Sequence, residues 1–339
     1  MSNPIDGFVV NKADIAFVGA ELQRPECILA QPDGSLWSAD ARGGVVHIRP
    51  DGTQRLVTQS LDSSFAASTD EATRFTEGTL PNGLAFDADG SILISNFGTD
   101  RLERMTRDGE TSVVLDTIDG TPIGKVNFVL RDSRGRIWLT ISTRITNWMR
   151  AISPNIADGY VAVLDGKGAR IVADGFHFTN EIRFDAREEW LYVVETTARR
   201  ITRLRIGEDA RVEEREIFGP ADTGGFIDGI AFDAYGNLWG THVMSDRIFA
   251  LTPQGEMRII LDDDRPEPSK RLYEAFARDK ATPELMLACG GDIAPWFASL
   301  TFGGTDLCNV YIGSLRGSRI PWFRSPVPGL PMAHWPRER

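Results

Sequence analysis

The sequence predicts an all-β fold, a six-bladed β-propeller, and three observations support that prediction. First, six repeats follow one another, and in five of them a polar residue precedes a short apolar strand, a turn and a second strand; the sixth has FGGTDLCNVYIGSL in place of the usual turn. Second, the polar residues that open successive repeats lie 56, 45, 53 and 48 positions apart in the first five repeats. A period of about 40–50 residues with four strands in each unit is typical of propeller blades. Third, one strand is left over at the N-terminus.

The repeats begin near residues 24, 80, 125, 179, 227 and 299. The leftover strand, residues 14–22, would complete the last blade and close the ring, which removes open strand edges. We therefore expect one propeller domain over residues 14–332, with an N-terminal extension at 1–13 and a C-terminal tail at 333–339. A β-sandwich is the main alternative, but sandwich strands do not recur with matched opening residues.

Two segments interrupt the pattern. Residues 265–292 carry Leu272, Tyr273, Phe276 and Ala277 at helical spacing, which predicts a short helical insertion before or within blade six. Residues 142–158, inside the third repeat, form a long segment without strand periodicity. Long segments of this kind in compact folds tend to be functional, so we expect a lid here.

Composition excludes several classes of protein. A net charge of −11 and a pI near 5.0 argue against nucleic acid as a partner, because phosphate binding needs clustered Lys and Arg. Three cysteines without CxxC spacing favour a reducing, cytoplasmic environment and argue against a thiolate zinc site. We expect neither a membrane span nor a secretory signal. Nucleophile-elbow, P-loop and dinucleotide motifs are absent from the sequence.

The opening residues are the first candidate site. In a propeller the innermost strands line a central channel, so the residues that begin them meet at one end of it. They are Glu26, Asn82, Asn127, Asn180 and Asp228. Carboxylate and carboxamide oxygens suit hard divalent cations, Ca²⁺ first and Mg²⁺ or Mn²⁺ as alternatives. Asn-Gly and Asp-Gly pairs also form simple turns, but neither Glu26 nor Asn127 has an evident turn role.

A second set of residues ends the second strand of each blade, which returns to the same end of the channel. Its members are Asp40, Asn96, Thr143, Glu195 and His242. The alternative for His242, and for His177 just before the fourth repeat, is a histidine without a role. Apolar walls would come from five aromatic residues, which could equally belong to the core: Phe128, Trp148, Phe176, Phe178 and Phe226.

These motifs resemble the regucalcin (senescence marker protein) and gluconolactonase family of six-bladed propeller lactonases. The matching stretches are RPECI with LWSAD, LPNGLAFDADG, TNEIRFD with LYVVET, IDGIAFDAYGNLW and FGGTDL, which together span residues 24–331. The resemblance implies a divalent metal, calcium or zinc, held by Glu26, Asn180 and Asp228. It implies that Asn127 is a fourth ligand or a substrate contact, and that Asp228 is the general base or proton carrier in lactone hydrolysis.

The chain departs from the family at the third repeat. Relatives that act on sugar lactones often have Arg at the position of Lys125 and Asp-Gly after the Asn, where this chain has Phe128-Val129. We expect a metal-dependent hydrolase that opens a sugar lactone or a more apolar lactone. The alternatives are an esterase or phosphotriesterase on the same site, and a non-catalytic calcium- or ligand-binding propeller. The expected substrate contacts are Asn82, Lys125, Trp148, His177, Glu195 and His242.

Overall fold

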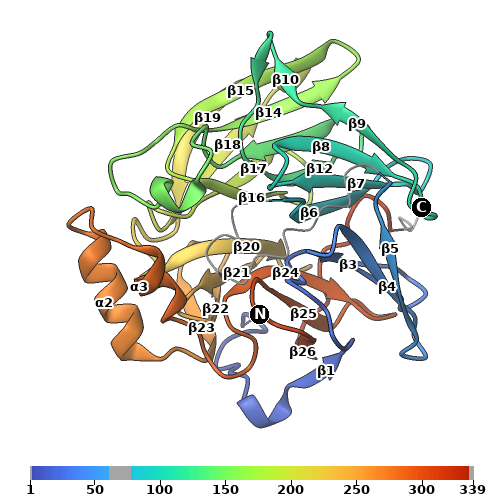
Figure 1. Cartoon of the computed structure of the whole chain (residues 1–339). Coiled ribbons are helices and arrows are strands. Elements are labelled where there is room, and N and C mark those ends of the chain that lie inside the picture. Colours follow the sequence, from blue (N-terminus) through green and yellow to red (C-terminus); the bar gives the residue numbers. More distant parts are fainter. Residues whose placement is uncertain (1, 61–77, 336–339) are drawn as a thin grey trace.

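Six four-stranded antiparallel sheets surround a common axis in the computed structural model, which describes residues 2–60 and 78–335 (Figure 1). The six-bladed β-propeller predicted from the repeats is confirmed. Every innermost strand contacts the innermost strands of both neighbouring blades, so the ring is closed. The innermost strands are β2 (Ile28–Ala30), β6 (Pro81–Phe86), β12 (Val126–Arg131), β16 (Thr179–Phe184), β20 (Phe226–Phe232) and β24 (Phe297–Gly303).

The remaining strands extend each blade outward in chain order. The second strands are β3 (Leu36–Asp40), β7 (Ile92–Asn96), β13 (Ile137–Ile141), β17 (Trp190–Glu195), β21 (Leu238–Val243) and β25 (Asn309–Ser314). The third strands are β4 (Gly44–Ile48), β8 (Arg101–Met105), β14 (Gly159–Asp165), β18 (Arg200–Ile206), β22 (Arg247–Leu251) and β26 (Ile320–Arg324). The outer strands are β5 (Gln54–Thr58), β9 (Thr111–Leu115), β15 (Gly168–Phe176), β19 (Val212–Phe218) and β23 (Met257–Asp262). A small hairpin, β10 (Thr117–Ile118) with β11 (Thr121–Pro122), follows blade two.

The N-terminal strand closes the ring, as predicted. Strand β1 (Ala16–Val18) pairs antiparallel with β26, so the outer strand of blade six comes from the other end of the chain. The strand is shorter than the expected 14–22. Residues Lys12–Asp14 form a 3₁₀ turn, and Gly19 leaves the extended conformation at φ +75°.

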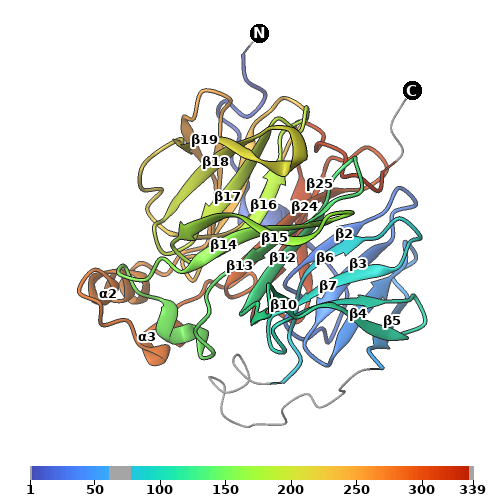
Figure 2. The ribbon, with the colours of Figure 1, turned by 90° about the horizontal axis from the view of Figure 1, so that it is seen from above.

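The predicted helical insertion is also confirmed and lies before blade six. Helices α2 (Pro266–Phe276) and α3 (Pro283–Leu287) connect β23 to β24, on the side of the molecule opposite the two chain ends (Figure 2). Leu272 and Phe276 are buried, whereas Ala277 lies beyond the end of α2 and is exposed. No helix in the described residues is long and apolar enough to cross a membrane.

In three blades, the same kind of hydrogen bond links the turn after the innermost strand to a tryptophan of the second strand. The indole N–H of Trp239 donates to Asp233, that of Trp138 donates to Asp132, and that of Trp37 donates to Gln31, each acceptor lying six residues earlier. A buried indole needs such a partner. The recurring turns and tryptophans of the sequence therefore fix the same geometry in three blades.

Candidate functional site

Four of the five opening residues, all except Glu26, lie at irregularities in the innermost strands. The pairing of β6 with β7 shifts register between Pro81 and Leu84, and β12, β16 and β20 shift at the equivalent place. A β-bulge re-aims side chains and is common next to active sites. Side-chain hydroxyls of the second strands fill the gaps: Thr140 accepts from the amide of Phe128, and Thr241 from that of Gly229.

These four bulges, together with the turn that carries Glu26 into β2, bring the five opening residues around one cavity of about 40 Å³ at the channel end near the helical insertion. Its polar floor consists of Arg24, Glu26, Asn82, Asn127, Asn180, Thr196 and Asp228. Its walls are apolar, formed by Phe97, Trp148, Ile152, Phe178, Phe226, Val243, Met244 and Leu315. Residues from all six blades or their connections therefore meet in one small space.

Three oxygens of this floor are buried and have no hydrogen-bond partner among the described residues: Oε2 of Glu26, Oδ1 of Asn127 and Oδ1 of Asn180. An unpaired buried acceptor costs free energy, so this set is suited to a ligand that supplies positive charge or donors. Asp228 adds a carboxylate beside Asn180, whose side chain hydrogen-bonds to it. The donor set fits a hard divalent cation, which prefers oxygen ligands.

The described residues contain no group of three or more His, Cys, Asp and Glu side chains positioned to hold a metal. A cation at this floor would therefore depend on the amide oxygens of Asn127 and Asn180 together with the two carboxylates. Ligand sets with few charges bind hard cations more weakly than carboxylate-rich sets.

The two carboxyl groups of the floor favour their protonated forms. Burial raises the pKa of Glu26 well above its usual value, and the charge of Asp228 raises it further. Burial likewise raises the pKa of Asp228 to about 7, with a smaller contribution from the charge of Glu181, while Arg24 and Asn180 oppose the shift. A bound cation would reverse both shifts, because nearby positive charge favours the ionised carboxylate.

Asn82 is fully engaged within the protein. Its Nδ2 donates to Oε1 of Glu26 at 3.1 Å and to the backbone oxygen of Asn127 at 2.9 Å, and its Oδ1 accepts from Arg24 at 2.6 Å. It therefore holds Glu26, Arg24 and the β12 backbone together. Because both ends of the amide are used, Asn82 differs from Asn127 and Asn180, whose oxygens are unpartnered.

The positively charged side chain that lines the cavity is that of Arg24, which was not among the predicted site residues. Lys125 lies outside the lining: its Nζ contacts Oδ1 of Asp100 at 2.9 Å and donates to the backbone oxygen of Phe97 at 3.2 Å. Both cations stand two positions before an opening residue, Arg24 before Glu26 and Lys125 before Asn127. That shared spacing is the signal in the sequence that could have identified Arg24.

Of the other expected substrate contacts, Trp148 lines the cavity, whereas His177, Glu195 and His242 do not. Glu195 accepts from Arg200, Thr202 and the amide of His177, all within blade four or its preceding loop. Other residues that end second strands are similar. Asp40 accepts from Arg42 and from the amide of Gln23.

His242 is enclosed in blade five. Its Nε2 lies 3.0 Å from the hydroxyl of Thr223, and its ring stacks on Phe249 with centroids 4.7 Å apart. Burial, the largest effect, lowers the pKa of His242 to about 3, so the ring is neutral at physiological pH.

Three of the five aromatic residues expected as walls line the cavity: Trp148, Phe178 and Phe226. Phe128 and Phe176 instead belong to the buried core cluster of blades one to four. Trp148 lies in the 3₁₀ helix η2 (Trp148–Ala151) and contacts Phe97 and Phe178, each with ring centroids 6.0 Å away. Helix α2 supports Phe226 through Phe276, whose ring lies 4.8 Å from it.

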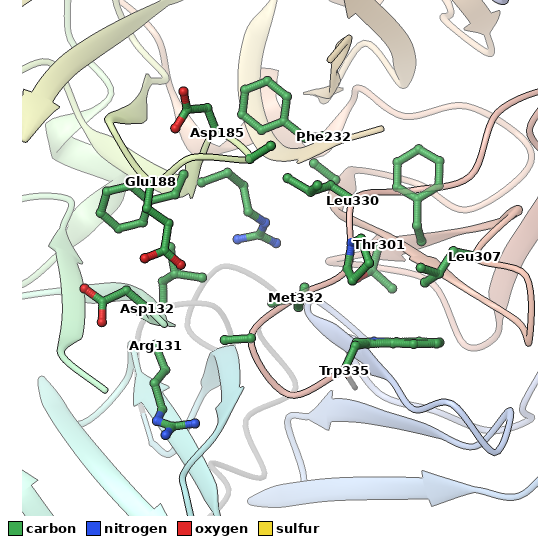
Figure 3. A pocket seen from close by; sticks show the side chains of 18 of the residues that line it. Arg131, Asp132, Asp185, Glu188, Phe232, Thr301, Leu307, Leu330, Met332 and Trp335 are labelled. Carbon is green, nitrogen blue, oxygen red and sulfur yellow. The ribbon is translucent and has the colours of Figure 1, made fainter. Parts of the chain in front are cut away.

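A second cavity, about 740 Å³, lies where the innermost strands end and the C-terminal segment crosses the channel (Figure 3). Its acidic side chains already have partners: Asp132 accepts from Arg136 and Trp138, and Asp185 accepts from two backbone amides. No buried polar atom without a partner in the described residues belongs to its lining. Although this cavity is larger than the one around Asp228, it has no buried, unpartnered polar atoms among the described residues that could bind a ligand.

Known proteins resemble this chain in sequence over part of its length and in fold over nearly all of it. Residues 111–262 match the model of the family described as SMP-30/Gluconolactonase/LRE-like region. The family resemblance is confirmed. The matched residues, less than half of the chain, run from β9 to β23 and include Asn127, Asn180 and Asp228.

A 6-deoxy-6-sulfogluconolactonase of Pseudomonas putida is 26% identical over 153 residues, which are 44% of this chain and 43% of that protein. The match therefore spans less than half of the relative's length.

Solved structures are similar over nearly the whole chain. A gluconolactonase of Xanthomonas campestris is 18% identical with a TM-score of 0.66, covering 95% of this chain and 94% of its own. The calcium-binding protein regucalcin of Agrobacterium tumefaciens is 14% identical with a TM-score of 0.63, covering 92% and 95%. A streptogramin B lyase is 15% identical with a TM-score of 0.57, covering 91% and 96%. At these identities the likeness shows the fold, which here is shared by proteins with different reactions.

Proposed function

We propose that this protein is a metal-dependent hydrolase that opens a lactone ring at the cavity around Asp228. The observation that carries the proposal is the set of buried, unpartnered oxygens of Glu26, Asn127 and Asn180 beside the Asp228 carboxylate. The SMP-30/gluconolactonase/LRE-like region and the lactonase among the relatives support the reaction class.

Glu26, Asn127, Asn180 and Asp228 would hold the cation, with Ca²⁺ as the first candidate and Zn²⁺, Mg²⁺ or Mn²⁺ as alternatives. When bound, such an ion supplies Lewis acidity that polarises a carbonyl and stabilises negative charge on its oxygen. Asp228 would accept a proton from the attacking water and return it to the ring oxygen as the carbon–oxygen bond breaks. Burial raises the pKa of Asp228 to about 7 without a cation, and a bound cation would lower it and so favour the ionised form that accepts the proton.

The walls favour an apolar substituent on the lactone over a sugar. The cavity is polar only at its floor, and all eight wall residues are apolar. Hydroxyl groups of a sugar placed against these walls would lose their hydrogen bonds to water without replacement, which costs free energy. An alkyl or aryl substituent would instead gain from burial on the same surface.

The cavity of about 40 Å³ accommodates only a few water molecules, so substrate entry requires a wall to move. We propose that residues 142–158, which include η2 and carry Trp148, act as the lid.

The test is turnover of a panel by the purified protein with and without a chelator: glucono-delta-lactone, gamma-decalactone, an aryl ester and a phosphotriester. We expect gamma-decalactone hydrolysis that a chelator abolishes and added cation restores, and its loss in Asp228→Ala. Preferred turnover of the aryl ester or the phosphotriester would point to the esterase or phosphotriesterase alternative. Cation binding without turnover of any substrate would leave a binding propeller, and full activity of Asp228→Ala would refute the mechanism.

The apolar wall gives a second prediction. Replacing Trp148 by Ala removes an aromatic surface whose full burial contributes roughly 1.5–3 kcal/mol, so KM for gamma-decalactone should rise about tenfold or more. Turnover of small unsubstituted lactones should change less. Met149→Ala is the matched control, because Met149 is buried in the same 3₁₀ helix but does not line the cavity. Equal effects of the two substitutions on both substrates would contradict the wall assignment.

A further inference from the structure

Arg24 occupies an unusual position in the candidate site. Its backbone adopts φ +54°, in the left-handed region that a residue with a side chain rarely enters. This conformation turns the chain just before Glu26 and lets Arg24 reach the neighbouring blade. There Nη1 donates to the backbone oxygen of Pro81 at 3.1 Å, and Nη2 donates to Oδ1 of Asn82 at 2.6 Å. Strained residues of this kind cluster at functional sites.

The guanidinium is only partly used by these contacts. Arginine carries five N–H groups, and the two hydrogen bonds to Pro81 and Asn82 engage two of them. Nε is buried and has no hydrogen-bond partner among the described residues. Among the fully buried polar atoms of the lining residues that have no partner in the described structure, it is the one donor, and the other three are oxygen acceptors.

The charge of Arg24 also acts on the carboxyl groups of the floor, since it opposes the raised pKa values of Glu26 and Asp228. No ion pair within 4 Å links it to either group in the described structure. The guanidinium of Arg24 therefore lies near the carboxyl groups of Glu26 and Asp228 without forming an ion pair with either. A ligand oxygen in this cavity would meet a positively charged donor on one side and the oxygen-rich cage on the other.

We propose that Arg24 is a catalytic residue of this site, which donates a hydrogen bond to the carbonyl oxygen of the lactone and then to the carboxylate of the ring-opened product. The proposal rests on the lactonase function proposed above. As the oxygen of water bonds to the carbonyl carbon, negative charge collects on the carbonyl oxygen, and a charged donor stabilises it. The ring carbon–oxygen bond then breaks, the ring oxygen leaves as a hydroxyl group, and the new carboxylate keeps its contact with Arg24.

The experiment compares wild type with Arg24→Met, which keeps much of the side-chain volume and removes the donors. Turnover of gamma-decalactone is measured, and calorimetry measures binding of the hydroxy acid formed from it. Removing one such donor costs about 100-fold in turnover in comparable sites, and we expect a loss of that order in kcat/KM. The affinity for the hydroxy acid should fall about tenfold or more, as for a lost charge-assisted hydrogen bond. Arg55→Met, an exposed cation in the outer strand of the same blade, is the control for charge removal alone.

Thermal unfolding with and without Ca²⁺ separates this role from a structural one. Removing a positive charge beside the oxygen cage should leave the Ca²⁺-induced rise in Tm unchanged or larger. Loss of that rise together with activity would mean that Arg24 only holds the cage, and would overturn the proposal. Turnover by Arg24→Met within threefold of wild type would also overturn the proposal. The same holds if both proteins bind the hydroxy acid equally, or if neither binds it. If wild type hydrolyses no lactone but binds the hydroxy acid through Arg24, the lactonase function and the catalytic role both fail, and Arg24 is a carboxylate-binding residue only.

Discussion

Asp228 and His242 lie in the same blade, yet burial moves their pKa values in opposite directions. Burial disfavours the charged form of any group. It therefore raises the pKa of Asp228 to about 7 and lowers the pKa of His242 to about 3. Asp228 can change its protonation state near neutral pH, whereas His242 stays neutral. His242 therefore does not account for a titration between about pH 5 and 8, whereas the carboxyl groups of the cavity floor can.

We expect kcat/KM for lactone hydrolysis to fall at acidic pH, because protonated Asp228 cannot accept a proton from water, and the cation-free pKa of about 7 sets the upper limit of the midpoint. A bound cation would move the midpoint lower, since positive charge favours the carboxylate. The measurement is the pH profile of wild type and of His242→Gln at saturating cation. Disappearance of the acidic limb in a folded His242→Gln protein would assign the titration to the histidine instead.

Sequence reasoning at the level of single residues succeeded where position in the repeat decides the environment. The opening residues of five blades share a cavity because each precedes or begins an innermost strand, and in four of the blades equivalent bulges turn them inward. The same reasoning could not separate Arg24 from Lys125, which stand at equivalent positions. A left-handed backbone directs Arg24 toward the cavity, whereas Asp100 from the preceding blade engages Lys125. The backbone conformation of Arg24 and the contact between Asp100 and Lys125 both depend on tertiary structure, so neither leaves a pattern in the nearby sequence.

At the level of elements, a single carboxyl group anchors the end of the helical insertion. Asp246, at the turn after β21, accepts hydrogen bonds from the backbone amides of Gly291, Trp296 and Phe297. This contact leads the chain from α3 into β24, while α2 packs behind Phe226 in the cavity wall. The sequence predicted the helix from its periodicity, but this anchor lies about 45 residues away along the chain and has no local signature.

Replacing Asp246 by Ala should destabilise the protein by about 3 kcal/mol or more, because three buried amides lose their acceptor. Burial raises the pKa of Asp246 to about 7, above its usual value of 3.8. The favourable contribution of protonated Asp246 to the free energy of unfolding is therefore complete below about pH 4 and is lost as pH rises through about 7.

Chemical denaturation at pH 5 and pH 8 measures the free energy of unfolding of Asp246→Ala and of wild type. The difference between the two proteins should be larger at pH 5. Asp292→Ala, an exposed residue paired with Arg265, is the control and should change little.

For the whole molecule, closure of the ring depends on the pairing of the two ends of the chain. Strand β1 covers the edge of β26, with Ala16 opposite Trp322 and Val18 opposite Ile320. The leftover strand in the sequence predicted this closure, since six repeats with one strand to spare leave few other arrangements. The hairpin β10–β11 was not predicted, because its two-residue strands are too short to show periodicity.

Deletion of residues 1–18 should lower Tm by several degrees or more and promote association, because it exposes the β26 edge and removes Ile5 and Val10 from the core. Phe17→Ser is the matched control, since it keeps the backbone pairing of β1 while removing a partly exposed apolar side chain. Thermal unfolding and light scattering across protein concentration make the comparison. A truncated protein that stays monomeric with the Tm of wild type would show that closure does not rely on β1.

Cation binding should stabilise the whole ring, because its expected ligands come from four blades: Glu26 from blade one, Asn127 from blade three, Asn180 from blade four and Asp228 from blade five. A ligand at 100 times its Kd adds about 2.7 kcal/mol to the free energy of unfolding. Protons compete with the cation for Glu26 and Asp228, whose pKa values are raised, so the increase in Tm should grow from pH 5.5 to pH 8.

Thermal unfolding with Ca²⁺, Zn²⁺, Mg²⁺ and Mn²⁺ at both pH values measures this increase in Tm. The Glu26→Gln, Asp228→Asn double variant should lose the increase, whereas Asp306→Asn, on an exposed acid, should keep it. An equal increase in the double variant would place the cation elsewhere on the molecule.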